Sequence, residues 1–368
     1  MKIGIITMYY NSVNYGGLLQ AFALCAVLKK YGYDAEQISY NNKEGFVKRF
    51  AKRLLKHHDK NTNESVSEYR RIIKLREAAI KTQAEHIIPH SNTVYSNSTI
   101  YRTNNIYTAF IAGSDQIWNS PSVGYFLNFV NGNNKRIAYA ASIGKKQIEE
   151  RLEEKYKSAF EKFNSISVRE ESTKKIVQRY TDKNVFVVFD PVLLVEKEEW
   201  NEIREDSGIN EDYLFCYFLG SDDRLRKLAV EFANNERLKI VSFPHLNGYV
   251  KNDVAFGDYQ VFDGNLGVFI DCIARAKCVF TDSFHATVFS SLYNVPFVSF
   301  SRKGKEQMDG RITDYLDLIG NRKRFCHDER DFSLAHILSV WNIECIERQD
   351  FLEKKEQSIL FLLNSLNG

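Results

Sequence analysis

A histidine near the start of a predicted helix is the first residue whose position points to chemistry. Residues 277–281 (KCVFT) form a short apolar strand, and Asp282 or Ser283 can then accept a hydrogen bond from the first amides of the helix that follows. His285 falls in the first turn of that helix. Such a turn carries unpaired N–H groups and the positive end of the helix dipole, so it attracts a phosphate or a carboxylate. The alternative is a partly buried histidine that hydrogen-bonds a neighbour.

Polar loops follow three predicted strands in the N-terminal half of the chain. The strands span residues 107–113, 136–144 and 165–170, and the loops after them read SDQIWN, SIGKK and REEST. Because ligands of α/β proteins bind at the carboxyl ends of the strands, these loops predict one rim of a cleft.

Two series of alternating strands and helices organise the chain. The first begins with a strand over residues 2–7, a helix over 18–31 and a strand over 35–40, which together start a βαβ pattern. The second begins near residue 212 and ends in the strand VPFVSF. The pattern predicts an α/β protein with two similar halves that face each other.

The length of 368 residues is enough for about two domains. We expect the first domain to end near Asp190-Pro191. Proline restricts the backbone of the residue before it and lacks the N–H group that a sheet hydrogen bond needs. We predict an N-terminal domain over residues 1–195 with a helical insertion at about 44–90, a C-terminal domain over 196–345, and a helix over 346–368.

The composition of the chain limits the partners that it is expected to bind and the cellular compartment in which it is expected to work. Fifty Lys and Arg against 47 Asp and Glu leave a formal charge of +3, which is too balanced to favour nucleic acid but leaves a small anion as a partner. The six cysteines form no CxxC pair and indicate reduced thiols in a cytoplasmic protein. Met1 opens directly into an apolar strand, and we expect no signal peptide and no membrane span. No cluster of histidines and carboxylates has the spacing of metal ligands, so no metal is expected.

A basic amphipathic stretch covers residues 46–58 (FVKRFAKRLLKHH). Phe46, Phe50 and Leu54 share one stripe, with lysines and arginines elsewhere. Such a helix can lie on an anionic membrane surface. A solvated helix face is the commoner explanation for a charge run, and it is the interpretation that we favour.

Six stretches together resemble the polysaccharide pyruvyl transferase family and occur in the family's order. They are NYGGLLQAFAL (14–24), GSDQIWN (113–119), YAASIGK (139–145), ISVREESTKKIV (166–177), FDPVLL (189–194) and TDSFHATVFSSLYNVPFV (281–298). The resemblance implies two Rossmann-like domains similar to the GT-B glycosyltransferase fold. It also implies transfer of pyruvate from phosphoenolpyruvate onto a sugar, usually as a cyclic ketal, with an acceptor side in the first domain and a donor side in the second.

The resemblance assigns donor contacts to several cationic residues. Phosphoenolpyruvate carries a carboxylate and a phosphate, and arginine meets either anion with two parallel hydrogen bonds. Arg169 resembles the family arginine proposed to hold the donor, and a pair with Glu170 or Glu171 is its alternative interpretation. The other donor-binding candidates are Ser283, Lys305 with its neighbours Arg302 and Lys303, and Arg311.

Proton transfer gives His285 its expected role. Protonating the methylene carbon of phosphoenolpyruvate creates an oxocarbenium-like centre, which one sugar hydroxyl attacks before phosphate departs and a second hydroxyl closes the ketal. Imidazole titrates near neutral pH and suits these steps. Asp115 is the candidate base for the acceptor hydroxyl, and capping of a following helix is its alternative.

The resemblance also places the acceptor near residues of the first domain. The candidates are Asn14, Tyr15, Gly16, Gly17, Gln116 and Trp118. The glycines let the backbone approach a ligand, and Trp118 either stacks on a sugar or packs in the core.

Two other functions stay open. A GT-B-type glycosyltransferase would use a nucleotide sugar, because helix N-termini hold a diphosphate equally well. The second alternative is a sugar-binding protein that derives from the same family and catalyses no reaction. No cofactor is expected, since phosphoenolpyruvate is a substrate, and the acceptor is a sugar or lipid-linked glycan met at the inner face of the cytoplasmic membrane.

Overall fold

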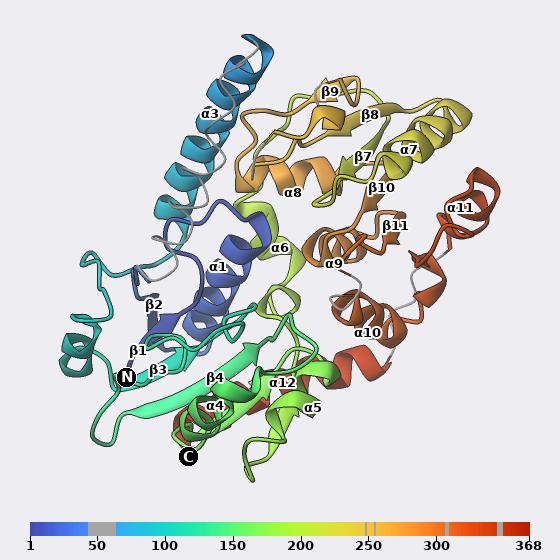
Figure 1. The fold of residues 1–368 in the computed structure, drawn as a ribbon. Helices are drawn as coiled ribbons and strands as arrows, with labels where there is room; N and C mark the ends of the chain where they lie inside the picture. The colour runs from blue at the N-terminus through green and yellow to red at the C-terminus, as the bar shows by residue number, and fades with distance from the viewer. Residues whose placement is uncertain (43–63, 247–248, 254, 306–308, 344–348) are drawn as a thin grey trace. The chain divides into compact units, whose positions relative to one another are not determined.

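The computed structural model describes residues 1–42, 64–246, 249–253, 255–305, 309–343 and 349–368, with the backbone alone at 64–68. The basic stretch 46–58 lies outside these residues. The chain forms two compact units (Figure 1). The first consists of Met1–Glu64, Glu85–Leu194 and Glu353–Gly368, and the second of Ser65–Ala84 and Val195–Leu352.

The first unit is built on a six-stranded parallel sheet, in the order β2-β1-β3-β4-β5-β6. Its strands are β1 (Lys2–Ile6), β2 (Asp34–Gln37), β3 (Ala109–Ala112), β4 (Lys135–Ala141), β5 (Ser165–Val168) and β6 (Val185–Val187). The order of the strands reverses between β1 and β3. In an open α/β sheet, such a reversal leaves a crevice at the carboxyl ends of the two strands, where ligands bind.

Helices complete the first unit. They are α1 (Tyr15–Lys30), α4 (Glu153–Phe160), α5 (Glu171–Val177) and α12 (Gln349–Asn367), with 3-10 turns η1 (Ile100–Asn105), η2 (Glu150–Leu152) and η3 (Pro191–Leu193). α12 is tied to the sheet far from it in sequence, because the Phe189 amide donates to Ser358 Oγ (2.9 Å) and Lys135 Nζ donates to the Leu366 carbonyl (2.6 Å).

Trp118 lies at the centre of the first unit's core and is fully buried. Its ring stacks on Phe126 at 5.7 Å between centroids and meets Phe160 edge-on at 5.0 Å. Its indole N–H donates to the Tyr125 carbonyl (3.1 Å), which satisfies the one polar group that burial would otherwise penalise.

The second unit is built on another six-stranded parallel sheet, in the order β12-β11-β10-β7-β8-β9. Its strands are β7 (Tyr213–Tyr217), β8 (Lys239–Ser242), β9 (Tyr259–Gln260), β10 (Cys278–Thr281), β11 (Phe297–Phe300) and β12 (Phe325–Cys326). Here the strand order reverses between β7 and β10. The two parallel sheets confirm the predicted α/β class.

The helices of the second unit cover both faces of its sheet, because the strands are apolar on both sides. They are α3 (Glu64–Ile87), of which Ser65–Ala84 fall in this unit, α6 (Lys197–Glu202), α7 (Asp223–Glu236), α8 (Leu266–Ala274), α9 (Phe284–Leu292), α10 (Gly310–Leu318) and α11 (Leu334–Val340), with η4 (Lys251–Asp253) and η6 (Arg322–Arg324). On one face Phe232 of α7 packs with Leu214 and Phe280 of the strands. On the other, Phe269 of α8 contacts Phe215 and Tyr217.

Within the described part of the chain, none of the helices combines the length and the apolar character needed to cross a bilayer.

Replacing Trp118 with alanine should strongly destabilise the first unit. The change leaves a large cavity and removes a buried indole, which costs about 3–5 kcal/mol of unfolding free energy. Urea unfolding followed by circular dichroism measures it. The control is Tyr101→Ala in the same unit, where the side chain is 54% exposed, and a change within about 0.5 kcal/mol is expected. Equal losses for both variants would contradict this account of the core.

Candidate functional site

One arginine and three carboxylates meet at the carboxyl edge of the first sheet. The guanidinium of Arg169, which follows β5, lies 2.7 Å from Asp190 (Nη1 to Oδ2), 3.4 Å from Glu170 (Nε to Oε2) and 3.5 Å from Asp115 (Nη2 to Oδ1). All four residues are buried. Arg169 is therefore no surface arginine, and its pairing with Glu170 is one part of a larger cluster.

Hydroxyl groups fix two of the three carboxylates. Ser142 Oγ and Thr173 Oγ1 each donate to Oε1 of Glu170 at 2.5 Å. Asp190 accepts from Ser114 Oγ through Oδ2 and from the Val192 amide through Oδ1, both at 3.1 Å. Because charge-assisted hydrogen bonds in a buried site are strong and directional, Glu170 and Asp190 are held in place.

The same network reaches the strand and helix that open the chain. The Ser114 amide donates to Gln20 Oε1 (3.0 Å), Gln20 Nε2 donates to Thr7 Oγ1 (3.1 Å), and Thr7 Oγ1 donates to the Ser114 carbonyl (2.8 Å). Gln20 lies on α1 and Thr7 follows β1. The polar groups at the point where the strand order reverses are thus joined across several elements.

Burial and charge act in opposite directions on Arg169. Burial lowers the pKa of its guanidinium, but the negative charges of Asp190, Glu170 and Asp115 outweigh burial and raise that pKa above its ordinary value. The arginine therefore stays charged among the three carboxyl groups.

Asp115 does not cap a following helix. Residues 113–134, which connect β3 to β4, form turns and a bridge, so there is no helix for it to cap there. The Asp115 backbone has a φ of 73°, and its carbonyl accepts from the amides of Ile117 (2.8 Å) and Ser142 (3.0 Å). These bonds present its carboxylate beside Arg169.

Two of the predicted acceptor residues lie in the core of the first unit. Trp118 and Tyr15 are both fully buried, so neither ring has a face for a sugar. Core packing, which the sequence left as the alternative, explains Trp118.

The remaining acceptor candidates follow β1 and β3 at the carboxyl edge of the first sheet, at the start of α1 and in the loop after β3. Asn14 is exposed and caps α1 by accepting from the Gly17 amide (3.4 Å), and Gly16 and Gly17 form its first turn. Gln116 is half-buried, and its Nε2 has no hydrogen-bond partner among the described residues.

In the second unit, His285 lies in the first turn of α9 and is buried. Ser283 is the N-cap residue, but its side chain makes no capping hydrogen bond. The prediction that Asp282 or Ser283 caps this helix is wrong, because the carboxylate of Asp282 is used elsewhere. The first turn of α9 carries the positive end of the helix dipole.

Asp282 instead holds the loop that follows β7. Its Oδ1 accepts from the Leu219 amide (2.6 Å) and its Oδ2 from the Gly220 amide (2.8 Å). Arg302 binds the same residue twice, through Nε to Oδ2 (3.2 Å) and through Nη2 to the backbone carbonyl (2.9 Å). A Cβ at Gly220 would lie 2.9 Å from Asp282 Oδ2, so glycine permits this approach.

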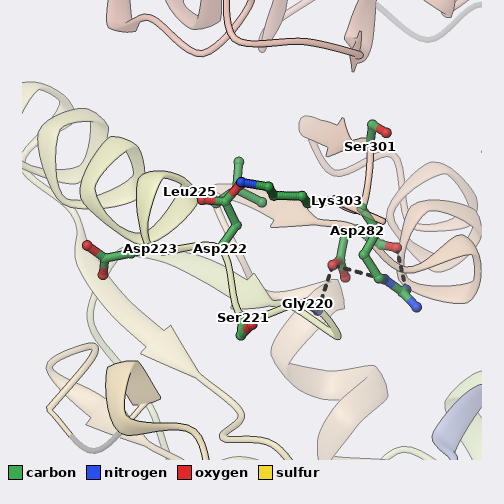
Figure 2. Close-up of a pocket in the computed structure, with 9 residues that line it drawn as sticks. Gly220, Ser221, Asp222, Asp223, Leu225, Asp282, Ser301 and Lys303 are labelled. Atoms are coloured by element: carbon green, nitrogen blue, oxygen red, sulfur yellow. Dashed lines mark hydrogen bonds and ion pairs between the residues drawn. The ribbon is translucent and has the colours of Figure 1, made fainter. Parts of the chain in front are cut away.

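A cavity of about 320 Å³ opens beside this loop (Figure 2). It lies at the ends of β7, β10 and β11, where the strand order of the second sheet reverses. Its lining residues are Gly220, Ser221, Asp222, Asp223, Leu225, Asp282, Ser301, Arg302 and Lys303.

Most charges in the cavity are paired. Asp282 pairs with Arg302, and Asp223 with Lys227 (2.9 Å). Asp222 accepts from Arg224, and this hydrogen bond and the positive charge of Lys303 lower the pKa of Asp222. The Lys303 side chain extends toward Asp222 (Figure 2).

The three candidate cations in the loop after β11 differ in whether they line the cavity. Arg302 and Lys303 line the cavity, whereas Lys305 is exposed and is not among the lining residues. Arg311 is half-buried on α10, Ser283 directly follows Asp282 in the chain, and His285 lies two residues after Ser283.

Sequence reasoning missed the loop at 219–222. Its signal was present, because glycine and serine between an apolar strand and the N-cap aspartate of a helix are typical of a loop that approaches a ligand.

Comparison with known proteins identifies both family and fold. A family model described as polysaccharide pyruvyl transferase matches residues 14–304, which is most of the chain. The matched range begins with the Asn14 motif and extends beyond the His285 motif. No curated protein matches the sequence.

Solved structures with the same fold share little sequence with this chain. UDP-GlcNAc 2-epimerase from Methanocaldococcus jannaschii has 11% identity and a TM-score of 0.55, over 99% of this chain and 100% of that chain. TarM from S. aureus, solved with fondaparinux, alpha-GlcNAc-glycerol and UDP, has 12% identity and a TM-score of 0.55, over 100% of both chains. The likeness shows the fold alone, which is of the GT-B type, as predicted.

Asp282→Asn should destabilise the second unit. An amide group must then face the Leu219 or Gly220 amide, so one buried donor loses its acceptor, at a cost of about 1–3 kcal/mol. Thermal unfolding measures the change. Asp317→Asn is the control, because its pair with Arg322 is exposed and contributes about 0–1 kcal/mol. If both variants have the same melting temperature as the wild type, Asp282 does not hold the loop that follows β7.

Proposed function

Because this chain belongs to the polysaccharide pyruvyl transferase family, we propose that it transfers pyruvate from phosphoenolpyruvate to a sugar, with a ketal as the product. The acceptor is a cell-surface polysaccharide or its lipid-linked precursor. The family match over residues 14–304 carries the proposal, and the chemistry of the two sheet edges supports it.

The second unit offers what an anionic donor needs. Phosphoenolpyruvate has a phosphate and a carboxylate, and two cations are the least that would hold both. Arg302 and Lys303 line the cavity, and the Ser283 side chain makes no capping hydrogen bond at the first turn of α9. The other donor contacts that the family resemblance assigns are Arg169, Ser283, Lys305 and Arg311.

His285 is the proposed acid and base of the reaction. It gives a proton to the methylene carbon of phosphoenolpyruvate, so that C2 becomes electrophilic and a sugar hydroxyl adds to it. The C2–O bond to phosphate then breaks, and the second hydroxyl forms the second C–O bond of the ketal. Each hydroxyl loses one proton, and inorganic phosphate leaves.

The first unit supplies the proposed acceptor side. Asp115 is the base for the attacking hydroxyl, and Asn14, Gly16, Gly17 and Gln116 line the same edge of the sheet. Carboxylates and amides are natural partners for sugar hydroxyls because they accept and donate hydrogen bonds in fixed directions.

The proposal includes no metal and no organic cofactor, since phosphoenolpyruvate itself carries the transferred group. The protein would work in the cytoplasm on an acceptor at the inner face of the membrane. Contact with that membrane through residues 46–58 stays a prediction.

Ligand protection tests the donor. Phosphoenolpyruvate is expected to raise the melting temperature, because it binds only the folded state, whereas UDP- and GDP-sugars should leave it unchanged. The reverse pattern would favour the glycosyltransferase alternative, and no protection by any donor would favour a non-catalytic sugar-binding protein.

His285→Ala should abolish transfer and leave the fold intact. The assay incubates the protein with phosphoenolpyruvate and a panel of galactosides, mannosides and glucosides, and mass spectrometry detects the gain of one pyruvyl group. Positioned acid–base groups contribute about 10²–10⁴-fold to rate, so a loss of that size is expected. His86→Ala is the control, because His86 is exposed on α3. Normal turnover by His285→Ala would rule out this role.

A further inference from the structure

We propose that Arg226 is a positioning residue of the donor site, which holds the loop at 219–222 in the shape that the donor needs. The inference rests on the proposed function in one respect, since the cavity beside this loop is there the donor site. Arg226 is not among the residues that line this cavity, so it acts through the loop. Every residue concerned lies in the second unit.

The guanidinium of Arg226 joins the loop at 219–222 to a buried carboxylate. Arg226 lies on α7, and its side chain is only 5% exposed. Its Nη1 donates to the Asp222 carbonyl (3.0 Å), and Nη1 and Nη2 donate to the Gly220 carbonyl (3.5 and 3.4 Å). Its Nε and Nη2 donate to Asp253 Oδ1 (3.1 and 2.5 Å). Each nitrogen of the guanidinium therefore has a hydrogen-bond partner.

Two aromatic rings keep the guanidinium in this place. Arg226 lies over the ring of Phe218 at 5.5 Å and over that of Phe256 at 5.7 Å. Ring faces attract a desolvated cation, and the carboxylate of Asp253 compensates its charge. Because Phe218 directly precedes the loop, the arginine contacts the start of the loop as well as its carbonyl groups.

Asp253 is itself held through its other oxygen. Its Oδ2 accepts from the backbone amide and from Nδ1 of His245, at 2.8 and 2.5 Å. Burial raises the pKa of Asp253, but the hydrogen bonds from His245 and the positive charge of Arg226 outweigh burial and lower that pKa. Asp253 therefore stays ionised, and it anchors the edge of the guanidinium that Nε and Nη2 form.

Charged groups hold the loop at successive peptide units. Asp282 accepts from the amides of Leu219 and Gly220. Arg226 donates to the carbonyls of Gly220 and Asp222. The Asp282 and Arg226 side chains are 1% and 5% exposed, so water competes little for these bonds. The loop backbone is thus fixed through its donors and through its acceptors.

The position of the loop decides which groups a donor can contact together. Ser221 lies in the loop, the cations Arg302 and Lys303 follow β11, and all three line the same cavity. An anion that binds these residues together needs them at a fixed spacing, and a misplacement of about 1 Å can cost about 100-fold in an enzyme site. Arg226 thus contributes to donor affinity without touching the donor.

Arg226→Lys tests the proposal. Lysine keeps the charge, but its single nitrogen cannot reach Asp253 and both carbonyls at once. We expect the dissociation constant of phosphoenolpyruvate, titrated below the melting temperature of each variant, to rise by about tenfold, which is about 1.4 kcal/mol. In the transfer assay the KM for phosphoenolpyruvate should rise with it, while kcat and the KM for the acceptor change less than about twofold.

The matched control is Arg324→Lys. Arg324 is also fully buried in the second unit, and its guanidinium lies over the Phe297 ring at 4.5 Å. Phe297 begins β11, so Arg324 lies beside the amino end of this strand, whereas the cavity lies at the carboxyl end. Arg324→Lys should lower the melting temperature, as Arg226→Lys does, and change the dissociation constant of phosphoenolpyruvate less than about twofold.

His245→Ala is the milder second variant should Arg226→Lys fail to fold. It removes the ring that holds Asp253 and leaves Arg226 in place, so we expect the dissociation constant of phosphoenolpyruvate to rise by about threefold. Wild-type affinity in both Arg226→Lys and His245→Ala would overturn the proposal. Equal loss of affinity in Arg226→Lys and Arg324→Lys would overturn it as well.

Amide hydrogen exchange separates this inference from the proposed function. Mass spectrometry of peptides that cover residues 213–222 reports how often the Leu219 and Gly220 amides open. Their exchange should be about tenfold faster in Arg226→Lys than in wild type and unchanged in Arg324→Lys, whether or not phosphoenolpyruvate binds. If wild type binds no phosphoenolpyruvate, the proposed function fails, and exchange alone decides whether Arg226 holds the loop. Faster exchange supports this role, and unchanged exchange rejects it.

Discussion

The buried guanidinium of Arg169 is the interaction on which the first unit's edge depends. It draws three carboxylates from the loops after β3, β5 and β6 to one place. Removing a partner from such a cluster leaves buried charge uncompensated, which is strongly destabilising. Five of the six family stretches contribute to this network, with Gln20, Ser114, Ser142, Arg169 and Asp190 as their members. These stretches meet here because the polar groups of each satisfy those of another.

Much of the fold could be predicted because the signals are local. The strand predicted at 2–7 is β1 at Lys2–Ile6, and the helix predicted at 18–31 is α1 at Tyr15–Lys30, which begins three residues earlier. The early start has a physical reason: Asn14 is the cap, and Gly16 and Gly17 can enter the helix behind it. Alternating apolar strands and amphipathic helices then lead to two parallel sheets.

The errors concern side chains whose partners are distant in sequence. Asp282 has the local pattern of a cap, but it binds amides about sixty positions earlier in the chain. Trp118 follows a polar loop, yet its neighbours Phe126 and Phe160 bury it. Tertiary contacts decide such cases, and no local spacing encodes them. The pairing of Arg169 with Glu170 was weighed from the sequence, but its pairing with Asp190 was missed for the same reason, since Asp190 is 21 residues away.

The two sheet edges carry different chemistry at equivalent positions. Each lies where the strand order reverses, which is where an α/β sheet leaves room for a ligand. The edge of the first sheet has an excess of buried carboxylates over its one arginine. The edge of the second has paired acids, the cations Arg302 and Lys303, and a histidine in the first turn of α9. Activation of a hydroxyl needs a carboxylate that can accept its proton, whereas binding of an anionic donor needs cations. This difference between the two edges supports the division of tasks that the proposed function makes, with the acceptor at the first unit and the donor at the second.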